Sequence, residues 1–207
     1  MSNAKRETLF TTRKLTTIAV LSAISAVLFM LEIPIVLFYK LDFSNLPVLL
    51  GAYAMGPVAG AIILLVKAAL GLLHSTSMGV GELADFIMGL AMLLPASLVY
   101  RFNKTRKSAI IGLAFGTVTA TIVSVFTNMY IMIPFFGAAY GMPVDAIVGM
   151  GQGIIPLVDS IWKFVLLITA PFNILKWVVI SIVCALIYKP LSPILHGRSM
   201  KKAVADK

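Results

Sequence analysis

The sequence predicts an all-α membrane protein, built as a compact bundle of six transmembrane helices with both chain ends in the cytoplasm. The apolar fraction is 60%, the charged fraction is 12% and the mean hydropathy is +1.01. A soluble domain typically has about 45–50% apolar and about 25% charged residues. In addition, several apolar stretches are long enough to cross a bilayer, and Lys and Arg gather between them.

A spanning helix needs about 20 apolar residues. Four stretches meet this criterion: Leu15–Pro34, Gly81–Tyr100, Ala109–Phe135 and Pro171–Tyr188. A fifth stretch, Leu46–Leu73, is longer and carries Gly56 and Pro57 in its middle. Proline starts helices well and disfavours helical geometry in the residue before it. We therefore expect a turn between two shorter helices at this pair.

The distribution of positive charge assigns the connections to the two sides of the membrane. Basic residues occur at the N-terminus, in the connection RFNKTRK at 101–107 and in the C-terminal tail. Lys and Arg mark the cytoplasmic side, so these three segments are expected inside. The connections 74–80 and 137–160 contain neither Lys nor Arg and are expected outside.

With this assignment, an even number of helices must separate residue 14 from residue 101. The turn at Gly56 satisfies that requirement, because it divides the fifth stretch into two helices. The predicted domain boundaries are a cytoplasmic segment 1–14, a membrane domain 15–189 and a basic cytoplasmic tail 190–207. The six predicted spans are 15–34, 43–56, 57–73, 81–100, 109–136 and 171–189.

Two features of this topology favour a cavity on the outer side. The second span is only about 21 Å long, shorter than the roughly 30 Å hydrocarbon layer, and such truncation leaves space above it. The long outer connection 137–160 has an apolar run around Ile147–Val158, which predicts a short surface helix or a lid.

Ionisable residues away from the inner flanks gather near the outer ends of the predicted spans, whereas the inner halves contain almost none. Polar groups inside a membrane are costly, and a channel would need them along its whole length. The pattern indicates a half-pocket that opens to the outside, with the loop 40–45 and the connection 137–160 as candidate lids. The candidate ligand-binding residues are Lys40, Leu41, Asp42, Phe43, Leu46, Lys67, Glu82, Asp85, Asn128, Asn173 and Lys176.

Some of these residues have a structural alternative. Asp42, or the neighbouring Ser44 or Asn45, can cap the second span. Glu82 and Asp85 can complement the positive end of the fourth span, and Lys67 can form an ion pair with one of them.

Asn128, Asn173 and Lys176 are the strongest candidates. Asn173 and Lys176 are three residues apart and share a helix face, after a Pro171 that we expect to start the helix. Asn128 lies too deep in its span for a simple cap.

Motifs for catalysis or nucleotide binding are absent from the sequence. It contains no G-x-x-x-x-G-K-[ST], no H-E-x-x-H and no G-x-S-x-G. The single Cys184 lies in an apolar run, as expected of a small buried hydrophobe, and no Cys/His cluster suggests a metal. The basic residues lack the interleaved aromatics of a nucleic-acid-binding face. We expect neither an enzyme nor a nucleic-acid-binding protein.

The first span carries Ala19 and Ala23 on one face, a spacing that lets another helix approach closely in lipid. That helix can belong to a partner or to this chain.

Two further stretches point to a known family. DFSNLPVLL (42–50), followed by GPVAG (56–60), and APFNILKW (170–177), followed by LIYKPLSPIL (186–195), resemble the S components of energy-coupling-factor transporters, in particular their riboflavin-specific branch. The resemblance covers nearly the whole chain.

The resemblance implies a multi-pass subunit of the cell membrane that binds riboflavin at its outer face and has no cofactor of its own. It implies a transmembrane coupling subunit and two cytosolic ATPases as partners, so that ATP is used only by other chains. It also implies that Ala19 and Ala23 face the coupling subunit and that the loop 40–45 covers the vitamin.

The chemistry of riboflavin is compatible with the candidate residues. Its isoalloxazine ring has apolar faces, which Leu41, Phe43 and Leu46 can cover. The polar ring edge has two carbonyls and one N–H, which Asn128, Asn173 and Lys176 can satisfy. The ribityl hydroxyls can form hydrogen bonds with four charged residues, which are Asp42, Lys67, Glu82 and Asp85.

Other ligands and classes remain open at this point. Biotin and folate would favour Lys or Arg in the pocket, and thiamine would favour Asp or Glu. A stand-alone secondary transporter would need an internal repeat or ionisable residues near the midplane. A membrane enzyme would need a catalytic constellation, and a purely structural subunit leaves the outer polar cluster unexplained.

Overall fold

The computed structural model describes residues 11–36 and 39–196, with side chains as far as Tyr188. Most of the predicted segments 1–14 and 190–207 lies outside the described residues. The elements are α1 Thr12–Met30, β1 Ile33–Val36, β2 Tyr39–Leu41, α2 Asn45–Met55, α3 Pro57–Gly71, a 3-10 turn η1 Leu72–His74, α4 Val80–Phe102, α5 Arg106–Thr127, a π turn η2 Asn128–Met132, α6 Ile133–Tyr140, α7 Val144–Gln152, α8 Ile161–Phe164, a π turn η3 Val165–Thr169 and α9 Ala170–His196.

Within the described residues, five helical runs are long and apolar enough to cross a membrane, and the short apolar helix α2 lies among them. The predicted all-α membrane bundle is therefore confirmed. The five runs are Thr12–Met30, Pro57–His74, Val80–Phe102, Arg106–Tyr140 and Ile161–Tyr188.

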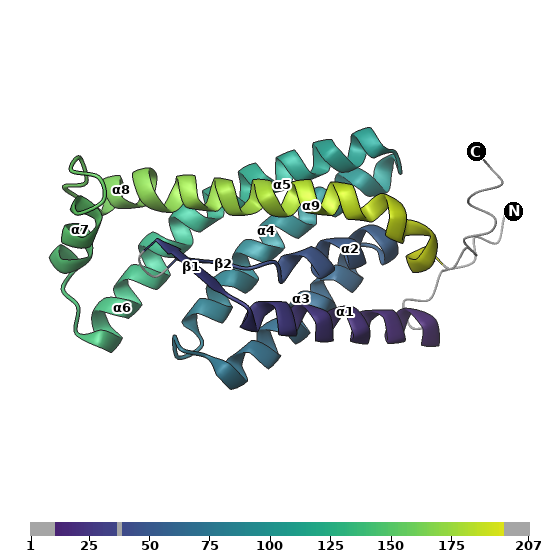
Figure 1. The fold of residues 1–207 in the computed structure, drawn as a ribbon, viewed down its shortest axis with the longest axis horizontal. Helices are drawn as coiled ribbons and strands as arrows, with labels where there is room; N and C mark the ends of the chain where they lie inside the picture. The colour runs from purple at the N-terminus through teal and green to yellow at the C-terminus, as the bar shows by residue number, and fades with distance from the viewer. Residues whose placement is uncertain (1–10, 37–38, 197–207) are drawn as a thin grey trace, which may run out of the picture.

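The bundle has two distinct ends (Figure 1). α1 begins and α9 ends at the same end of the bundle, which we call the termini end, and the α4–α5 connection lies there too. The strands β1 and β2 lie toward the opposite end, which we call the hairpin end.

The predicted turn at Gly56 and Pro57 is present. α2 ends at Met55, Gly56 has a φ of 101°, and Pro57 is the first residue of α3. This φ lies in the region that favours glycine, because a Cβ would clash with the backbone. α2 has 11 residues and is about 16 Å long, so it is even shorter than predicted.

The first predicted span ends earlier than expected. Residues 15–34 were expected to be one helix, but α1 stops at Met30 and residues 33–36 form strand β1. β1 pairs antiparallel with β2, with Ile33 opposite Leu41 and Pro34 opposite Lys40. The physical reason is that Pro34 disfavours helical geometry at Ile33, while β-branched residues suit a strand. Residues 40 and 41 of the predicted loop 40–45 consequently belong to strand β2, and Asn45 already begins α2.

The sixth predicted span starts ten residues too late, because the prediction that Pro171 begins the helix was wrong. The helical run begins at Ile161 and passes through η3 before α9. In η3 the N–H of Ala170 bonds to the carbonyl of Val165, five residues back. This wide turn directly precedes Pro171, which has no N–H to donate, so the helix continues through the proline.

The fifth predicted span also contains a π turn next to a proline, and it is also longer than predicted. In η2 the N–H of Ile133 bonds to the carbonyl of Asn128, five residues back, and Pro134 follows Ile133 directly. The helical run then continues to Tyr140 rather than ending at residue 136. The two π turns contact each other, so the two proline-adjusted helices meet near the hairpin end.

Packing of the bundle relies on small residues where helices approach closely. A Cβ added to Gly112 or Gly116 of α5 would lie 2.6 Å from a backbone carbonyl oxygen of α4. The connection 137–160 contains a short helix, as predicted, and this helix is α7 at Val144–Gln152. Its Ile147 packs against Val158 and Phe164.

Candidate binding cavity

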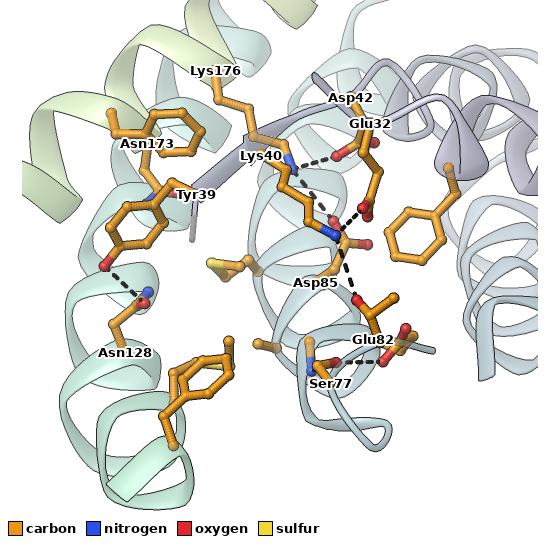
Figure 2. A pocket seen from close by; sticks show the side chains of 18 residues that line it. Glu32, Tyr39, Lys40, Asp42, Ser77, Glu82, Asp85, Asn128, Asn173 and Lys176 are labelled. Carbon is orange, nitrogen blue, oxygen red and sulfur yellow. Dashed lines mark hydrogen bonds and ion pairs between the residues drawn. The ribbon is translucent and has the colours of Figure 1, made fainter. Parts of the chain in front are cut away.

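A cavity of about 240 Å³ opens beside the β hairpin (Figure 2). Its lining comes from α1, the hairpin, the turn before α4, α4, η2, α6 and α9. Seven of the candidate ligand-binding residues line it: Lys40, Asp42, Glu82, Asp85, Asn128, Asn173 and Lys176.

The other four candidates, Leu41, Phe43, Leu46 and Lys67, are not among the described lining residues. Leu41 ends strand β2, and Phe43 lies in the following turn. Leu46 packs against the core that includes Leu49. The unpredicted hairpin accounts for Leu41, which lies in a strand rather than in a loop. Leu46 lies in the predicted second span, but it packs against the core.

Lys67 of α3 is fully buried and forms an ion pair with Asp85 of α4. Its ammonium group also donates to Ser44 Oγ at 3.0 Å and Asn45 Oδ1 at 3.1 Å. The predicted alternative of an ion pair with an acidic residue of the fourth span is therefore present. Lys67 stabilises the cavity wall through Asp85.

Lys176 joins this pair to the loop before α2 (Figure 2). Its Nζ lies 2.7 Å from Asp42 Oδ2 and 3.6 Å from Asp85 Oδ1. Two lysines and two aspartates thus form one buried network between α3, α4, α9 and the loop. Because the four formal charges cancel, the network adds no net charge to the cavity.

Asp42 is held in its ionised form by this network. Burial alone would raise the pKa of its carboxyl, but the ammonium groups of Lys176 and Lys67 outweigh that effect and lower the pKa to about 2. Asp42 Oδ1 also accepts the backbone N–H of Ser44 at 2.9 Å. The carboxylate therefore serves both the local turn before α2 and the Lys176 ion pair. The predicted capping of the second span is not seen, because Ser44 is the N-cap residue of α2 and makes no side-chain capping bond.

The rim of the cavity is tied together by side-chain contacts. Lys40 of β2 forms an ion pair with Glu32 and donates to Thr76 Oγ1 at 3.5 Å. Glu82 accepts hydrogen bonds from Ser75 at 2.8 Å and Ser77 at 3.1 Å. The hairpin and the turn before α4 are thereby held on either side of the opening.

Two amides line the side of the cavity nearest the π turns. Asn128 Nδ2 donates to the carbonyl of Ser124 at 2.8 Å, and Asn173 Nδ2 donates to the carbonyl of Thr169 at 2.9 Å. Each amide therefore bonds back to the carbonyl four residues earlier, at the boundary between an α helix and a π turn. These bonds hold one N–H of each amide on the backbone of its own helix.

Sequence reasoning missed the apolar part of the lining. Met132 and Phe136 follow Asn128 at intervals of four, so helical spacing could have found them. Tyr39 could not be found without the hairpin; its ring centroid lies 5.2 Å from that of Phe172. The larger apolar and aromatic residues that were missed are Phe29, Tyr39, Met88, Met132, Phe136 and Phe172.

The arrangement suits a ligand that has both a flat apolar surface and a polar edge. Aromatic rings and methionines supply apolar contacts, while amide and ammonium groups supply directed hydrogen bonds. The fold and the cavity define a multi-pass membrane protein with a small-molecule binding cavity at one end of its bundle.

Comparison with known proteins places this architecture in a family. Residues 13–188 match the family model described as "ECF transporter, substrate-specific component". The chain belongs to this family of transporter components, and it is not an enzyme. The family assignment agrees with the resemblance drawn from residues 42–60 and 170–195.

Individual relatives extend over nearly the same region. The riboflavin transporter RibU of Staphylococcus aureus (strain TCH60) is 34% identical over 186 residues, which cover 88% of this chain and 92% of that protein. The riboflavin transporter FmnP of Bacillus subtilis (strain 168) is 29% identical, covering 87% and 93%.

A solved structure, of the S component of a bacterial ECF transporter, superposes with a TM-score of 0.68 at 38% sequence identity. It covers 88% of this chain and 97% of that one. The similarity therefore extends over the whole bundle.

Proposed function

We propose that this chain captures riboflavin in the cavity at the hairpin end and delivers it for uptake by an ATP-driven coupling module. The observation that carries the proposal is the combination of aromatic surfaces with fixed amide and ammonium groups in one cavity. The relatives that carry the name riboflavin transporter support the choice of vitamin.

The charge balance of the cavity favours a neutral ligand over an acidic one. The two lysines that line the cavity each have a carboxylate partner: Lys40 with Glu32, and Lys176 with Asp42. Lys67, behind the cavity wall, is paired with Asp85. A carboxylate of biotin or folate would have to compete with these existing pairs. Riboflavin can instead hydrogen-bond to the network without disturbing its neutrality.

We assign the hairpin end to the extracellular side and the termini end to the cytoplasm. Arg13 and Lys14 lie in the first turn of α1, and Arg101, Lys104 and Arg106 lie at or near the α4–α5 connection. All are at the termini end, and the positive-inside rule supports their cytoplasmic placement.

The outward face of α1 is the proposed contact with a transmembrane coupling subunit. Ala19 and Ala23 are exposed on the described chain, which argues against the alternative that they pack internally. Small residues on an exposed face permit close approach of a partner helix in lipid. Since the sequence has no phosphate-loop motif, two cytosolic ATPase subunits would supply the energy, and ATP would bind only to them.

Purification in detergent followed by a flavin titration tests this function. We expect saturable quenching of riboflavin fluorescence at about one flavin per chain, with thiamine, biotin and folate unable to displace it. Saturable binding of one of those vitamins, with none of riboflavin, would overturn the substrate assignment. Riboflavin uptake by this chain in cells that lack any coupling module would favour a stand-alone secondary transporter instead.

A further inference from the structure

Tyr39 connects the hairpin to both π turns. It is buried, lies in β2 and stacks on Phe172 of α9. Its hydroxyl donates to Asn128 Oδ1 at 3.2 Å and is also hydrogen-bonded to Thr169 Oγ1. Figure 2 shows the Tyr39 side chain reaching from the hairpin toward Asn128. One hydroxyl group therefore touches the first residue of η2 and the last residue of η3.

These contacts form a continuous chain of hydrogen bonds. Because the Tyr39 hydroxyl donates its only proton to Asn128, the Thr169 hydroxyl must be the donor in its bond to Tyr39. The chain then ends at the Ser124 carbonyl, which accepts from Asn128. Each hydroxyl and amide in this chain has a defined direction, and reversing one would require reversing its neighbours.

The direction of these hydrogen bonds determines whether Asn128 can donate to a ligand or accept from it. Its Oδ1 already accepts from Tyr39, and one of its two N–H groups already donates to Ser124. Its second N–H is the donor that remains. Asn128 would therefore act mainly as a hydrogen-bond donor, which suits a carbonyl oxygen on the polar edge of a flavin.

We propose that Tyr39 is a positioning residue for specificity, which acts by fixing the Asn128 amide as a donor toward a ligand carbonyl. This inference rests on the proposed riboflavin binding. Without the Tyr39 hydroxyl, Asn128 Oδ1 would lose its donor and the amide could accept as well as donate. The preference for a carbonyl at that point of the ligand would then decrease.

Tyr39→Phe tests this role, because the variant keeps the aromatic ring and removes only the hydroxyl. The probes are riboflavin, 2-thioriboflavin and 4-thioriboflavin, in which sulfur, a weaker acceptor, replaces one ring carbonyl oxygen. We expect the wild-type protein to bind one thio analogue about tenfold more weakly than riboflavin, the equivalent of one hydrogen bond. In Tyr39→Phe this ratio should fall to about twofold.

The ratio distinguishes positioning from a merely structural role. A residue that only supports the fold would lower the affinity for all three flavins by the same factor. Asn128→Ala should abolish the discrimination, and Thr169→Val, which removes the donor to Tyr39, should lower it in the same direction. The Thr169 variant also keeps the test informative if Tyr39→Phe fails to fold.

Tyr130→Phe is the matched control, since Tyr130 also lies in η2 but is exposed and stacks on Phe126. It should leave all three affinities unchanged. An unchanged ratio in both Tyr39→Phe and Thr169→Val, with riboflavin binding intact, would overturn this inference alone. Equal affinity of the wild type for all three flavins would do the same. Absence of riboflavin binding by the wild type would overturn the proposed function and this inference together.

Discussion

The two ends of the bundle bury polar groups in different ways. At the hairpin end, Lys67, Asp85, Lys176 and Asp42 form a buried network of charges beside the cavity. At the termini end, the aromatic rings of Tyr53, Tyr100 and Tyr188 pack together, with centroids 4.8–5.6 Å apart.

The tyrosine hydroxyls at the termini end are satisfied without any charge. Tyr53 donates to the carbonyl of Ala109 at 3.1 Å, and Tyr100 and Tyr188 share a hydrogen bond of 2.8 Å. Neutral paired hydroxyls in an aromatic cluster cost little, whereas buried charges cost several kcal/mol each even when paired. The buried charges are thus concentrated beside the cavity, whereas the paired hydroxyls at the opposite end are neutral.

The largest expected effect separates transport from binding. Ala19→Trp, in the half of α1 near the termini end, should abolish riboflavin uptake in cells because a bulky ring would prevent close approach of a coupling subunit. The flavin affinity of the purified variant should stay unchanged. Val20→Trp is the control, because Val20 is also exposed but lies about 100° around the helix. Normal uptake by Ala19→Trp would remove the proposed contact.

The next effect concerns the stability of the charge network. Asp85→Ala leaves the fully buried Lys67 without its carboxylate partner and should destabilise the ligand-free protein by about 3–5 kcal/mol. Asp159→Ala breaks an exposed ion pair with Lys163 and should lower the thermal midpoint far less, because water and salt screen such a pair. Thermal unfolding in detergent measures both. Equal shifts for the two variants would contradict the distinction between buried and exposed pairs.

An effect of acid is expected from Asp42. Its pKa is lowered from 3.8 to about 2 in the folded protein, so its contribution is complete above about pH 4 and is lost as the pH falls toward 2. The loss amounts to about 2 kcal/mol. The thermal midpoint should therefore stay level from pH 7 to about 4, as far as Asp42 is concerned, and fall below that. Asp42→Asn should lack this component, and an identical acid profile in the variant would contradict the assignment.

The smallest effect is expected at the termini end. Tyr100→Phe removes the hydroxyl that pairs with Tyr188 and should destabilise the protein by about 1 kcal/mol. Riboflavin affinity should not change, because the aromatic cluster lies at the far end from the cavity. A loss of affinity comparable to that of a cavity variant would show that the two ends are coupled.

Sequence reasoning identified the features that depend on charge and on chain-breaking residues. Basic residues at both ends of the segment 14–101 required an even number of helices between them, and hence a turn at Gly56. The structure has this turn. Seven of the candidate residues line the cavity because polar residues at one membrane depth tend to converge. Local patterns of this kind do not depend on knowing which elements pack together.

The remaining features depend on tertiary contacts. Strands β1 and β2 are too short to be stable alone, so residues 33–41 could not be assigned before their environment was known. Pro171 looked like a helix start, and only the π turn at residues 165–169 makes its position inside a helical run understandable. Tyr39 was overlooked because its role depends on the hairpin bringing it to Asn128 and Thr169.

Labelling of introduced cysteines in intact cells tests the central claim most directly. Thr76 is exposed at the rim of the cavity, and Lys104 is exposed in the α4–α5 connection, while the native Cys184 is buried. A membrane-impermeant thiol reagent should label Thr76→Cys in intact cells, and riboflavin should slow that reaction. Lys104→Cys should react only after lysis. Labelling of Lys104→Cys in intact cells, or a rate at Thr76→Cys that riboflavin does not change, would contradict a flavin cavity open to the outside.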